Sequence, residues 1–269
     1  MSPTSKKHNK LVRFFAFPIR KIVKAISSTK YVKMEYRYIT GHRLNLKDPV
    51  RYTEKLQHLR LFEYKNNQKV SEAAGRVSAR DFVKNKGFAD NLINIYGVFN
   101  KFSDIDFNKL PNQFVMKCSH ACAYNYICFD KSKIDLIKLE KRFNKWLKTD
   151  YGKLTCEPHY SLIKPQIIIE ELLLENDYLP TEYKIHVFNG VAKAMYVVSN
   201  RDKDIRYNNY LIDWTPFDEM QFNHWKKSDE EIKKPSCWKG IIKMAEELAS
   251  EFPFVRVDLY CINEKIYFS

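Results

Sequence analysis

Phe252-Pro253-Phe254-Val255-Arg256-Val257-Asp258-Leu259-Tyr260, close to the end of the 269-residue sequence, alternates between apolar and polar side chains from Val255 onward. This period of two predicts a strand with Val255, Val257 and Leu259 on one face and Arg256 and Asp258 on the other. Arg256 and Asp258 would then lie about 7 Å apart along one face of that strand. The alternation therefore predicts a sheet with one apolar and one charged face.

The residues around this strand support the same structure. A run of helix formers over 238–250 predicts a helix that ends before Pro253. Asn263-Glu264 predicts a tight turn into a second short strand. The charged face has two interpretations: a solvated ion pair, or a site where Asp258 binds Mg²⁺ and Arg256 binds a phosphate or carboxylate. This stretch alone leaves both open.

The composition is that of a globular protein. Hydrophobic residues make up 45% of the chain, which contains 17 Tyr and 18 Phe, and no apolar run approaches the roughly 20 residues that cross a bilayer. Its six cysteines are scattered, which predicts mostly buried, reduced thiols in a cytoplasmic protein.

The net charge of +14 is concentrated at the N-terminus, because residues 1–33 carry nine Lys or Arg and no acid, leaving +5 for the rest. On a helical wheel one arc holds the apolar residues Leu11, Phe15, Ile19, Ile22, Val23 and Ile26, and the opposite arc holds Arg13, Arg20, Lys21 and Lys24. Such a segment suits an anionic membrane surface, at the inner face of the cell membrane for a cytoplasmic protein. The alternatives are a helix packed on the protein body and a mitochondrial presequence. We expect no nucleic-acid partner, because the rest of the chain shows no basic stripe with interleaved aromatic residues.

Three regions are predicted: the basic segment 1–33, a mostly helical region 34–111, and a region 112–269 rich in strands. The last region is predicted to contain strands over 114–118, 126–129, 167–169, 183–188 and 192–198 and a helix over 134–148. Asn189-Gly190 is the strongest hairpin signal in the chain.

Several charged residues fall on or beside these strands. Lys117 ends one strand, where its ammonium could reach phosphate oxygens, although taken by itself a lone exposed strand lysine is the more ordinary interpretation. Glu170 and Glu171 follow three isoleucines, and Glu182 and Lys184 share one strand face. Together these positions would supply cations for a polyphosphate and acids for a ribose and a metal.

The order of these motifs closely resembles the TupA-like ATP-grasp family of bacterial polysaccharide biosynthesis, from about residue 42 onward. The segments that carry the resemblance are Asn45-Leu46…Pro49…Glu54-Lys55-Leu56, Leu110-Pro111-Asn112-Gln113-Phe114-Val115-Met116-Lys117-Cys118-Ser119-His120, Ile168-Ile169-Glu170-Glu171, Glu182-Tyr183-Lys184…Phe188-Asn189-Gly190, and 252–260. The resemblance implies an ATP-grasp-like α+β fold with two mixed or antiparallel lobes around a nucleotide cleft.

The resemblance also implies roles for individual residues. ATP would be bound by Arg76, Lys117, Ser119, His120, Glu170, Leu172, Glu182 and Lys184; Asp258 would hold Mg²⁺, and Arg256 and Lys117 would act on the transferred phosphoryl group. In these roles Glu170 and the Leu172 backbone face adenine, and Glu182 faces the ribose. We expect Lys117, Glu170, Glu182 and Asp258 to line one cleft.

The sequence departs from the family pattern at three places. The phosphate loop reads Ala121-Cys122-Ala123 where the family has glycines, and alanine is disfavoured at positive φ. Gly75-Arg76 replaces an Asp-Lys pair. The family's Gly-Glu-Leu-Thr continuation, which provides a second Mg²⁺ ligand, does not follow, so we expect a C-terminally truncated fold with doubtful activity.

The function implied is that of an ATP-dependent carboxylate–amine ligase of capsule or cell-envelope polysaccharide synthesis. It would attach an amino acid to a uronic acid of a glycan through an acyl phosphate, using ATP and Mg²⁺. Two alternatives remain: a glycan-modifying, glycosyltransferase-like protein, and a truncated, non-catalytic protein that binds at the membrane.

Overall fold

The computed structural model describes residues 20, 22–220 and 225–269, so most of the predicted N-terminal amphipathic segment lies outside the described residues. Contacts between Cα atoms divide the chain into two compact units. Among the described residues, the first comprises 20, 22–74 and 149–164, and the second comprises 75–148, 165–220 and 225–269. The three regions predicted from the sequence follow different boundaries and stay a prediction.

The first unit is helical. Its elements are α2 (Ser28–Thr40), α3 (Tyr52–His58), the π-helical turn η1 (Leu59–Glu63), α4 (Gln68–Ala74), α7 (Tyr151–Thr155) and the 3₁₀ helix η6 (Pro158–Leu162). Glu54 of α3 is buried and accepts backbone N–H groups of Asn45, Val50 and Arg51 at 3.0–3.2 Å. The Asn45…Glu54 motif therefore fixes the loop before α3, because one carboxylate satisfies three backbone donors.

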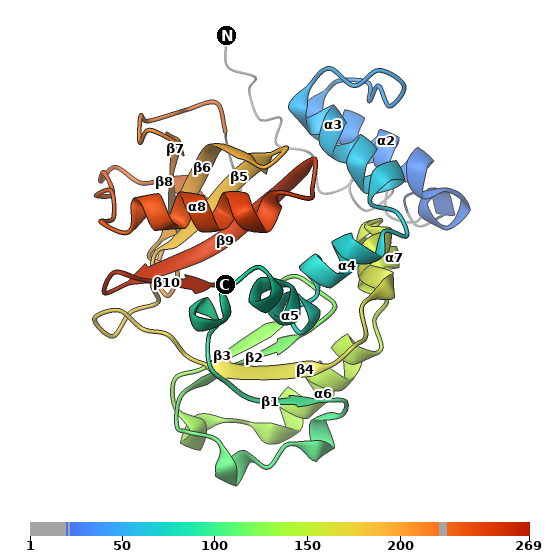
Figure 1. Cartoon of the computed structure of the whole chain (residues 1–269). Helices are drawn as coiled ribbons and strands as arrows, with labels where there is room; N and C mark the ends of the chain where they lie inside the picture. The colour runs from blue at the N-terminus through green and yellow to red at the C-terminus, as the bar shows by residue number, and fades with distance from the viewer. Residues whose placement is uncertain (1–19, 21, 221–224) are drawn as a thin grey trace. The chain divides into compact units, whose positions relative to one another are not determined.

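The second unit contains two sheets and the helices that cover them (Figure 1). Its helices are α5 (Ser78–Asn85), α6 (Leu136–Leu147) and α8 (Trp238–Ala249), with short 3₁₀ helices at Ala89–Asn91, Phe102–Asp104, Phe107–Lys109 and Lys131–Lys133. The predicted helices over 134–148 and 238–250 correspond to α6 and α8.

The smaller sheet has four antiparallel strands in the order β1-β4-β2-β3. They are β1 (Ile95–Phe99), β2 (Phe114–Cys118), β3 (Asn125–Cys128) and β4 (Ile167–Glu171). One face packs on α6 through buried Phe114, Met116, Ile167 and Ile169 against Phe143. Because side chains alternate along a strand, Val115, Lys117, Ile168 and Glu170 project from the other face.

The larger sheet has six strands in the order β10-β9-β5-β6-β7-β8. They are β5 (Glu182–Phe188), β6 (Val191–Ser199), β7 (Arg206–Leu211), β8 (Lys226–Lys227), β9 (Phe254–Ile262) and β10 (Lys265–Phe268). Only β7 and β8 pair in parallel among these strands. Both predicted tight turns are present, since Asn189, Gly190, Asn263 and Glu264 all have positive φ.

The α8 helix covers one face of the larger sheet (Figure 1). Ile241, Met244 and Leu248 of α8 pack against a face that includes Ile185 and Leu259, all buried. The apolar side of the strand 252–260 is thus the core side, as its alternation predicts. The charged side of that strand projects from the opposite face.

The cysteines differ in part from the expectation of reduced thiols. Cys237 and Cys261 form a disulfide, which ties the start of α8 to β9. Cys118, Cys128 and Cys156 are buried thiols, and Cys122 is exposed. The sequence offered no spacing that would have predicted the pair, because the two cysteines meet only when α8 packs on the sheet.

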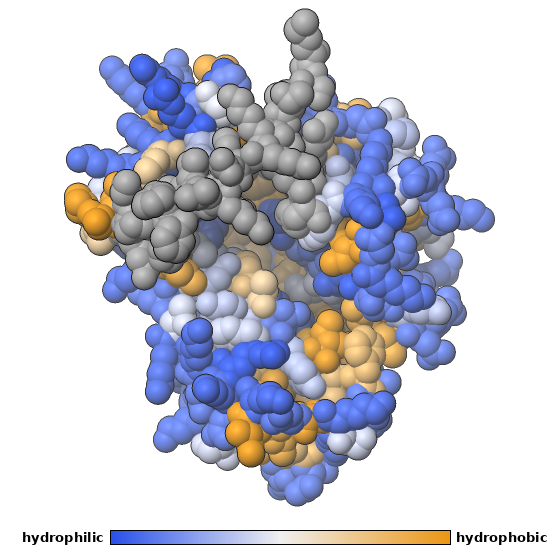
Figure 2. Space-filling view, turned by 180° about the vertical axis from the view of Figure 1, so that it is seen from behind, coloured by the Kyte–Doolittle hydropathy of each residue, from blue (hydrophilic) through white to orange (hydrophobic). Residues whose placement is uncertain are grey.

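On the face shown in Figure 2, hydrophilic residues (blue) cover most of the surface of the described residues, with hydrophobic residues in several separate groups. Within the described part of the chain no helix is both long and apolar enough to span a bilayer.

Candidate functional site

The smaller sheet contributes a buried ion pair to the site. Lys117 of β2 and Glu170 of β4 project from the face opposite α6, and Lys117 Nζ lies 2.5 Å from Glu170 Oε2. Both side chains are largely buried, at 12% and 8% exposure. A buried charge of either sign is costly without a partner, so each residue stabilises the ionised form of the other.

Burial lowers the pKa of Lys117, and nearby Arg76 lowers it further, although Glu170 and Glu182 oppose both effects. Lys117 therefore binds its proton less tightly than an exposed lysine does. A bound anion, such as a phosphate, would stabilise the protonated, positively charged form of Lys117.

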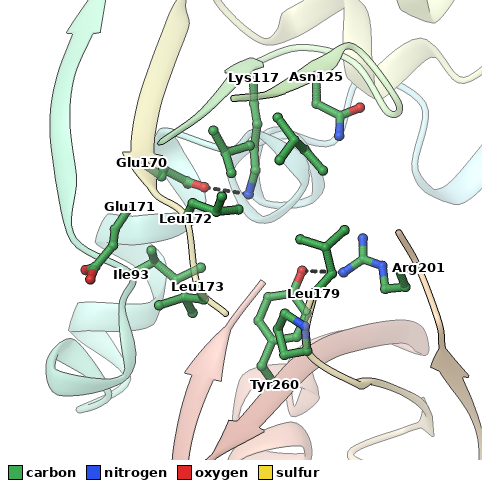
Figure 3. A pocket seen from close by; sticks show the side chains of 13 residues that line it. Ile93, Lys117, Asn125, Glu170, Glu171, Leu172, Leu173, Leu179, Arg201 and Tyr260 are labelled. Carbon is green, nitrogen blue, oxygen red and sulfur yellow. Dashed lines mark hydrogen bonds and ion pairs between the residues drawn. The ribbon is translucent and has the colours of Figure 1, made fainter. Parts of the chain in front are cut away.

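These two residues line a pocket within the second unit (Figure 3). Its walls combine apolar and polar side chains, which come mainly from the smaller sheet and the segment after β4, with Tyr260 from β9 and Arg201 from the turn after β6. The lining residues are Ile93, Val115, Lys117, Asn125, Ile127, Glu170, Glu171, Leu172, Leu173, Leu179, Pro180, Arg201 and Tyr260. Such a lining suits a ligand that contains a flat apolar ring with a few polar groups at its edge.

The larger sheet contributes a denser set of charges. In the antiparallel pairing of β5 with β9, Lys184 lies opposite Asp258, and Glu182 lies opposite Tyr260. Lys184 Nζ is 2.5 Å from Asp258 Oδ2 and 3.0 Å from Glu182 Oε1. Arg256 donates to both Asp258 oxygens, from Nε to Oδ1 at 2.6 Å and from Nη2 to Oδ2 at 2.8 Å.

This network shifts the ionisation of its members. Burial opposes the charge of Asp258, but Arg256 and Lys184 outweigh burial and hold the pKa of its carboxyl well below the ordinary range. The pKa of Arg256 is raised, because the Asp258 carboxylate outweighs the partial desolvation of a guanidinium whose side chain is 44% exposed. Burial together with Arg256 lowers the pKa of His186, on the same face, to about 4. His186 is therefore neutral at physiological pH.

Two residues that the sequence did not single out connect the two sets of charges. Arg201 donates from Nη1 to Tyr260 Oη at 2.8 Å and lies 3.4 Å from Glu182 Oε2. Both Arg201 and Tyr260 line the pocket that holds Lys117 and Glu170 (Figure 3). Tyr260 could have been found as the next residue after Arg256 and Asp258 on the same face of β9. Arg201 follows β6 in a turn and carries no such signal.

The predicted phosphate loop follows Lys117 and is held by backbone contacts. Ser119 exchanges two hydrogen bonds with Gln166: its N–H donates to Gln166 O at 2.8 Å, and its Oγ accepts from Gln166 N at 2.9 Å. His120 is buried, with Nε2 3.2 Å from Trp146 O. Ser119 and His120 therefore fix the base of the loop and do not line the pocket.

Arg76 lies against this loop. Its N–H donates to Ser119 O at 3.0 Å, and its Nε lies 3.4 Å from Ala121 O. Ala123 has a φ of 61°, in the left-handed region where alanine is strained. The expectation that alanine replaces glycine at a positive-φ position of this loop is thus met at Ala123.

The predicted site residues fall into three groups. Lys117, Glu170 and Leu172 line the pocket, and Glu182, Lys184, Arg256 and Asp258 form the charged network of the larger sheet. Arg201 and Tyr260 link these two groups, whereas Ser119, His120 and Arg76 position the loop. Of the four residues expected to line one cleft, Lys117 and Glu170 line the pocket, whereas Glu182 and Asp258 are not among its lining residues. Their individual roles stay predictions.

The residues can be compared with what ATP and Mg²⁺ require. Lys117, Lys184, Arg201 and Arg256 supply cations for a polyphosphate, and the apolar walls suit a base. Mg²⁺ in nucleotide sites is held by one or two carboxylates together with phosphate oxygens, so Asp258 and Glu182 fit in kind. Among residues 20, 22–220 and 225–269 no group of three or more His, Cys, Asp or Glu could hold a metal. The phosphate oxygens would therefore have to complete any metal site here.

Comparison with known proteins identifies a family. The family model described as TupA-like ATP-grasp matches residues 54–269. No match to the chain exists among curated proteins.

The solved structures to which this chain is similar include several ligases. D-alanine–D-alanine ligase from Bacillus anthracis is 14% identical, with 76% of this chain and 58% of that chain covered and a TM-score of 0.49. L-amino acid ligase from Bacillus licheniformis is 12% identical, with 88% and 52% covered and a TM-score of 0.47. Phosphoribosylamine–glycine ligase from Thermotoga maritima is 15% identical, with 82% and 57% covered and a TM-score of 0.46. The chain thus spans between about half and three-fifths of their lengths.

Proposed function

The chain belongs to the TupA-like ATP-grasp family, and on this premise we propose that it is an ATP-dependent ligase that joins a carboxylate to an amine. Its two sheets and their covering helices form the ATP-grasp-like α+β fold that the sequence predicted. The observation that carries the proposal is the pairing of a partly apolar, Lys117-containing pocket with the cation-rich face of β5 and β9, linked through Arg201 and Tyr260.

In the proposed reaction a carboxylate oxygen attacks the terminal phosphorus of ATP, and the bond to the bridging oxygen breaks to release ADP. An amine then attacks the carbonyl carbon of the acyl phosphate, phosphate leaves, and the amine loses a proton. ATP supplies the leaving group that makes the carboxylate electrophilic. Catalysis of this kind depends mostly on positioning and on electrostatic stabilisation of the transferred charge.

Different residues of the site would bind the base, the ribose and the phosphates of ATP. The apolar walls of the pocket would bind the base and exclude water, with Glu170 and the Leu172 backbone at its polar edge. Lys117 would contact phosphate oxygens, and Glu182 would accept hydrogen bonds from ribose hydroxyls through one oxygen while the other, Oε1 beside Lys184, stays available to a metal. Arg256, held by both oxygens of Asp258, is rigidly oriented and would stabilise the phosphoryl group during transfer.

The substrates we propose are a uronic acid within a cell-surface glycan as the carboxylate and an amino acid as the amine. This choice rests on the family resemblance of the motifs. ADP release should be measured with Mg²⁺-ATP, a glucuronate oligosaccharide and each amino acid in turn. We expect release to require both substrates and to fall by at least tenfold in Asp258→Asn.

Other outcomes would favour other functions. Binding of a sugar nucleotide together with glycosyl transfer, and no use of ATP, would support a glycan-modifying transferase instead. Absence of any nucleotide binding by calorimetry would support a binding protein without catalysis. Either result would overturn the ligase proposal.

For the basic segment we propose contact with an anionic membrane surface at the inner face of the cell membrane. The nine basic residues among residues 1–33 support this, at about 1 kcal/mol each near anionic headgroups. Deleting residues 1–26, which ends before the N-cap of α2 and keeps buried Val32, should abolish co-sedimentation with phosphatidylglycerol vesicles. Unchanged sedimentation would exclude the segment as the anchor.

A further inference from the structure

Lys184 lies between the two carboxylates that would be available to a metal. Its ammonium is 2.5 Å from Asp258 and 3.0 Å from Glu182, and these are the carboxylates that fit Mg²⁺ in kind. The contacts follow from the sheet itself, because Lys184 pairs with Asp258 across β5 and β9 and shares a strand face with Glu182. The Lys184 side chain is only 10% exposed, so water screens these contacts poorly.

We propose that Lys184 is an internal cation that excludes a divalent metal from Glu182 and Asp258 until a polyphosphate draws its ammonium away. This inference rests on the nucleotide site of the proposed function. An ammonium between two carboxylates repels a second cation at short range, and it also uses the oxygen lone pairs that would bind the metal.

The three cations of the network, Lys184, Arg201 and Arg256, differ in how easily they can move away from the two carboxylates. Arg256 binds both oxygens of Asp258 through a planar fork, a geometry that fixes the guanidinium. Lys184 presents a compact ammonium on a flexible four-carbon stem, which can turn toward a new anion. Arg201 lies farther away, 3.4 Å from Glu182, and also donates to Tyr260. Lys184 is therefore the movable member.

A phosphate chain beside the network offers Lys184 new oxygens while it brings further ligands for the metal. Departure of the ammonium frees one lone pair on Glu182 Oε1 and one on Asp258 Oδ2, which still accepts from Arg256, at the moment when the phosphates can complete the metal's coordination. Metal and nucleotide consequently bind with positive coupling, and each raises the affinity of the other by the same factor.

The test measures Mn²⁺ binding to the full chain without nucleotide, from the electron paramagnetic resonance signal of free Mn²⁺. The unaltered protein should bind weakly, and Lys184→Met should bind at least tenfold more tightly. Lys184→Met/Asp258→Asn should lose that gain, which assigns it to these carboxylates. Lys193→Met, an exposed lysine of the neighbouring strand β6, should change nothing.

A second measurement adds ADP. In the unaltered protein ADP should raise the affinity for Mn²⁺ strongly, and in Lys184→Met the same addition should have a clearly smaller effect. Equal Mn²⁺ affinity of the two proteins without nucleotide would overturn the proposal. A loss of thermal stability in Lys184→Met with no gain in Mn²⁺ affinity would also overturn it and would assign Lys184 a purely structural role.

If Lys184→Met does not fold by circular dichroism, Lys184→Gln serves in its place, because it keeps hydrogen-bond donors without the charge and should show the same gain. ADP binding in metal-free buffer tests the proposed nucleotide site separately. Its absence would remove the proposed function, while the measurement with Mn²⁺ alone would still decide whether Lys184 excludes a metal.

Discussion

The two sheets of the second unit build opposite kinds of surface from the same alternating pattern. The smaller sheet places one ion pair, Lys117 with Glu170, in a pocket that is apolar on one side and also lined by Asn125, Arg201 and Tyr260. The larger sheet places two carboxylates and three cations in one connected network on β5, β9 and the turn after β6. Both sheets bury their other face under a helix.

This difference in the number of neighbouring charges gives the two sheets different properties. An isolated pair between apolar walls can recognise a ligand that carries few charges, and its lysine can release its proton if the partner is lost. A network that contains arginines cannot relax in that way, because a guanidinium keeps its proton. We therefore expect the larger sheet to be the more sensitive to loss of one charge.

The largest expected effect is that of removing the shared anion of the network. Asp258→Ala leaves Arg256 and Lys184 without their common partner and should lower the free energy of unfolding by about 3–5 kcal/mol. Glu170→Ala should cost less, about 1–3 kcal/mol, because burial already lowers the pKa of Lys117 and lets it become neutral. Urea unfolding of both variants checks the order, and a larger cost for Glu170→Ala would break the comparison.

A pH dependence should come next in size, and its largest part should come from His186 of the larger sheet. The pKa of His186 is about 4 when folded and about 6.5 in the unfolded chain, so between these values the unfolded state binds the extra proton. The free energy of unfolding should therefore fall as the pH drops from about 6.5 to 4, by up to about 3 kcal/mol.

His186→Gln should remove this contribution in denaturant titrations across that range. The remaining slope then reports other groups, including His159 of the first unit, whose pKa burial also lowers. An unchanged slope in His186→Gln would show that Arg256 and burial do not keep His186 neutral.

Substitutions in the pocket of the smaller sheet should change the affinity for ADP more than the free energy of unfolding. Lys117→Met should weaken ADP binding by tenfold or more, about 1.4 kcal/mol, because a phosphate contact is lost. The double variant Lys117→Met/Glu170→Gln is the control, since it leaves no buried charge and should unfold close to the unaltered protein. Retained ADP affinity in both variants, measured by calorimetry, would place the nucleotide elsewhere.

The smallest expected effect concerns the loop between β2 and β3. Ala123→Gly should raise the free energy of unfolding by about 0.5–1 kcal/mol, because glycine relieves the strain of a φ of 61°. The matched Ala121→Gly should lower it instead, because Ala121 is buried and has no positive φ. Thermal unfolding of the pair distinguishes local strain from a general effect of glycine.

Several strands could be predicted because their signals are local. The runs 114–118 and 183–188 became β2 and β5 within a residue of the predicted ends, and Asn189-Gly190 formed the expected turn. β7 was missed, because its central Asn208 and Asn209 are residues typical of turns. In the fold their side-chain amides donate to Glu230 O and Met220 O, contacts that only a folded chain can supply.

The sequence by itself determined which residues share a strand face, since side chains alternate along any extended backbone. It thereby placed Arg256 with Asp258 and Glu182 with Lys184. Only the tertiary structure decided that β4 lies between β1 and β2, that Lys184 meets Asp258 across 74 residues of chain, and that Arg201 joins the network. These contacts depend on strand pairing and register between distant segments, which the burial of whole sheet faces selects and no local pattern encodes.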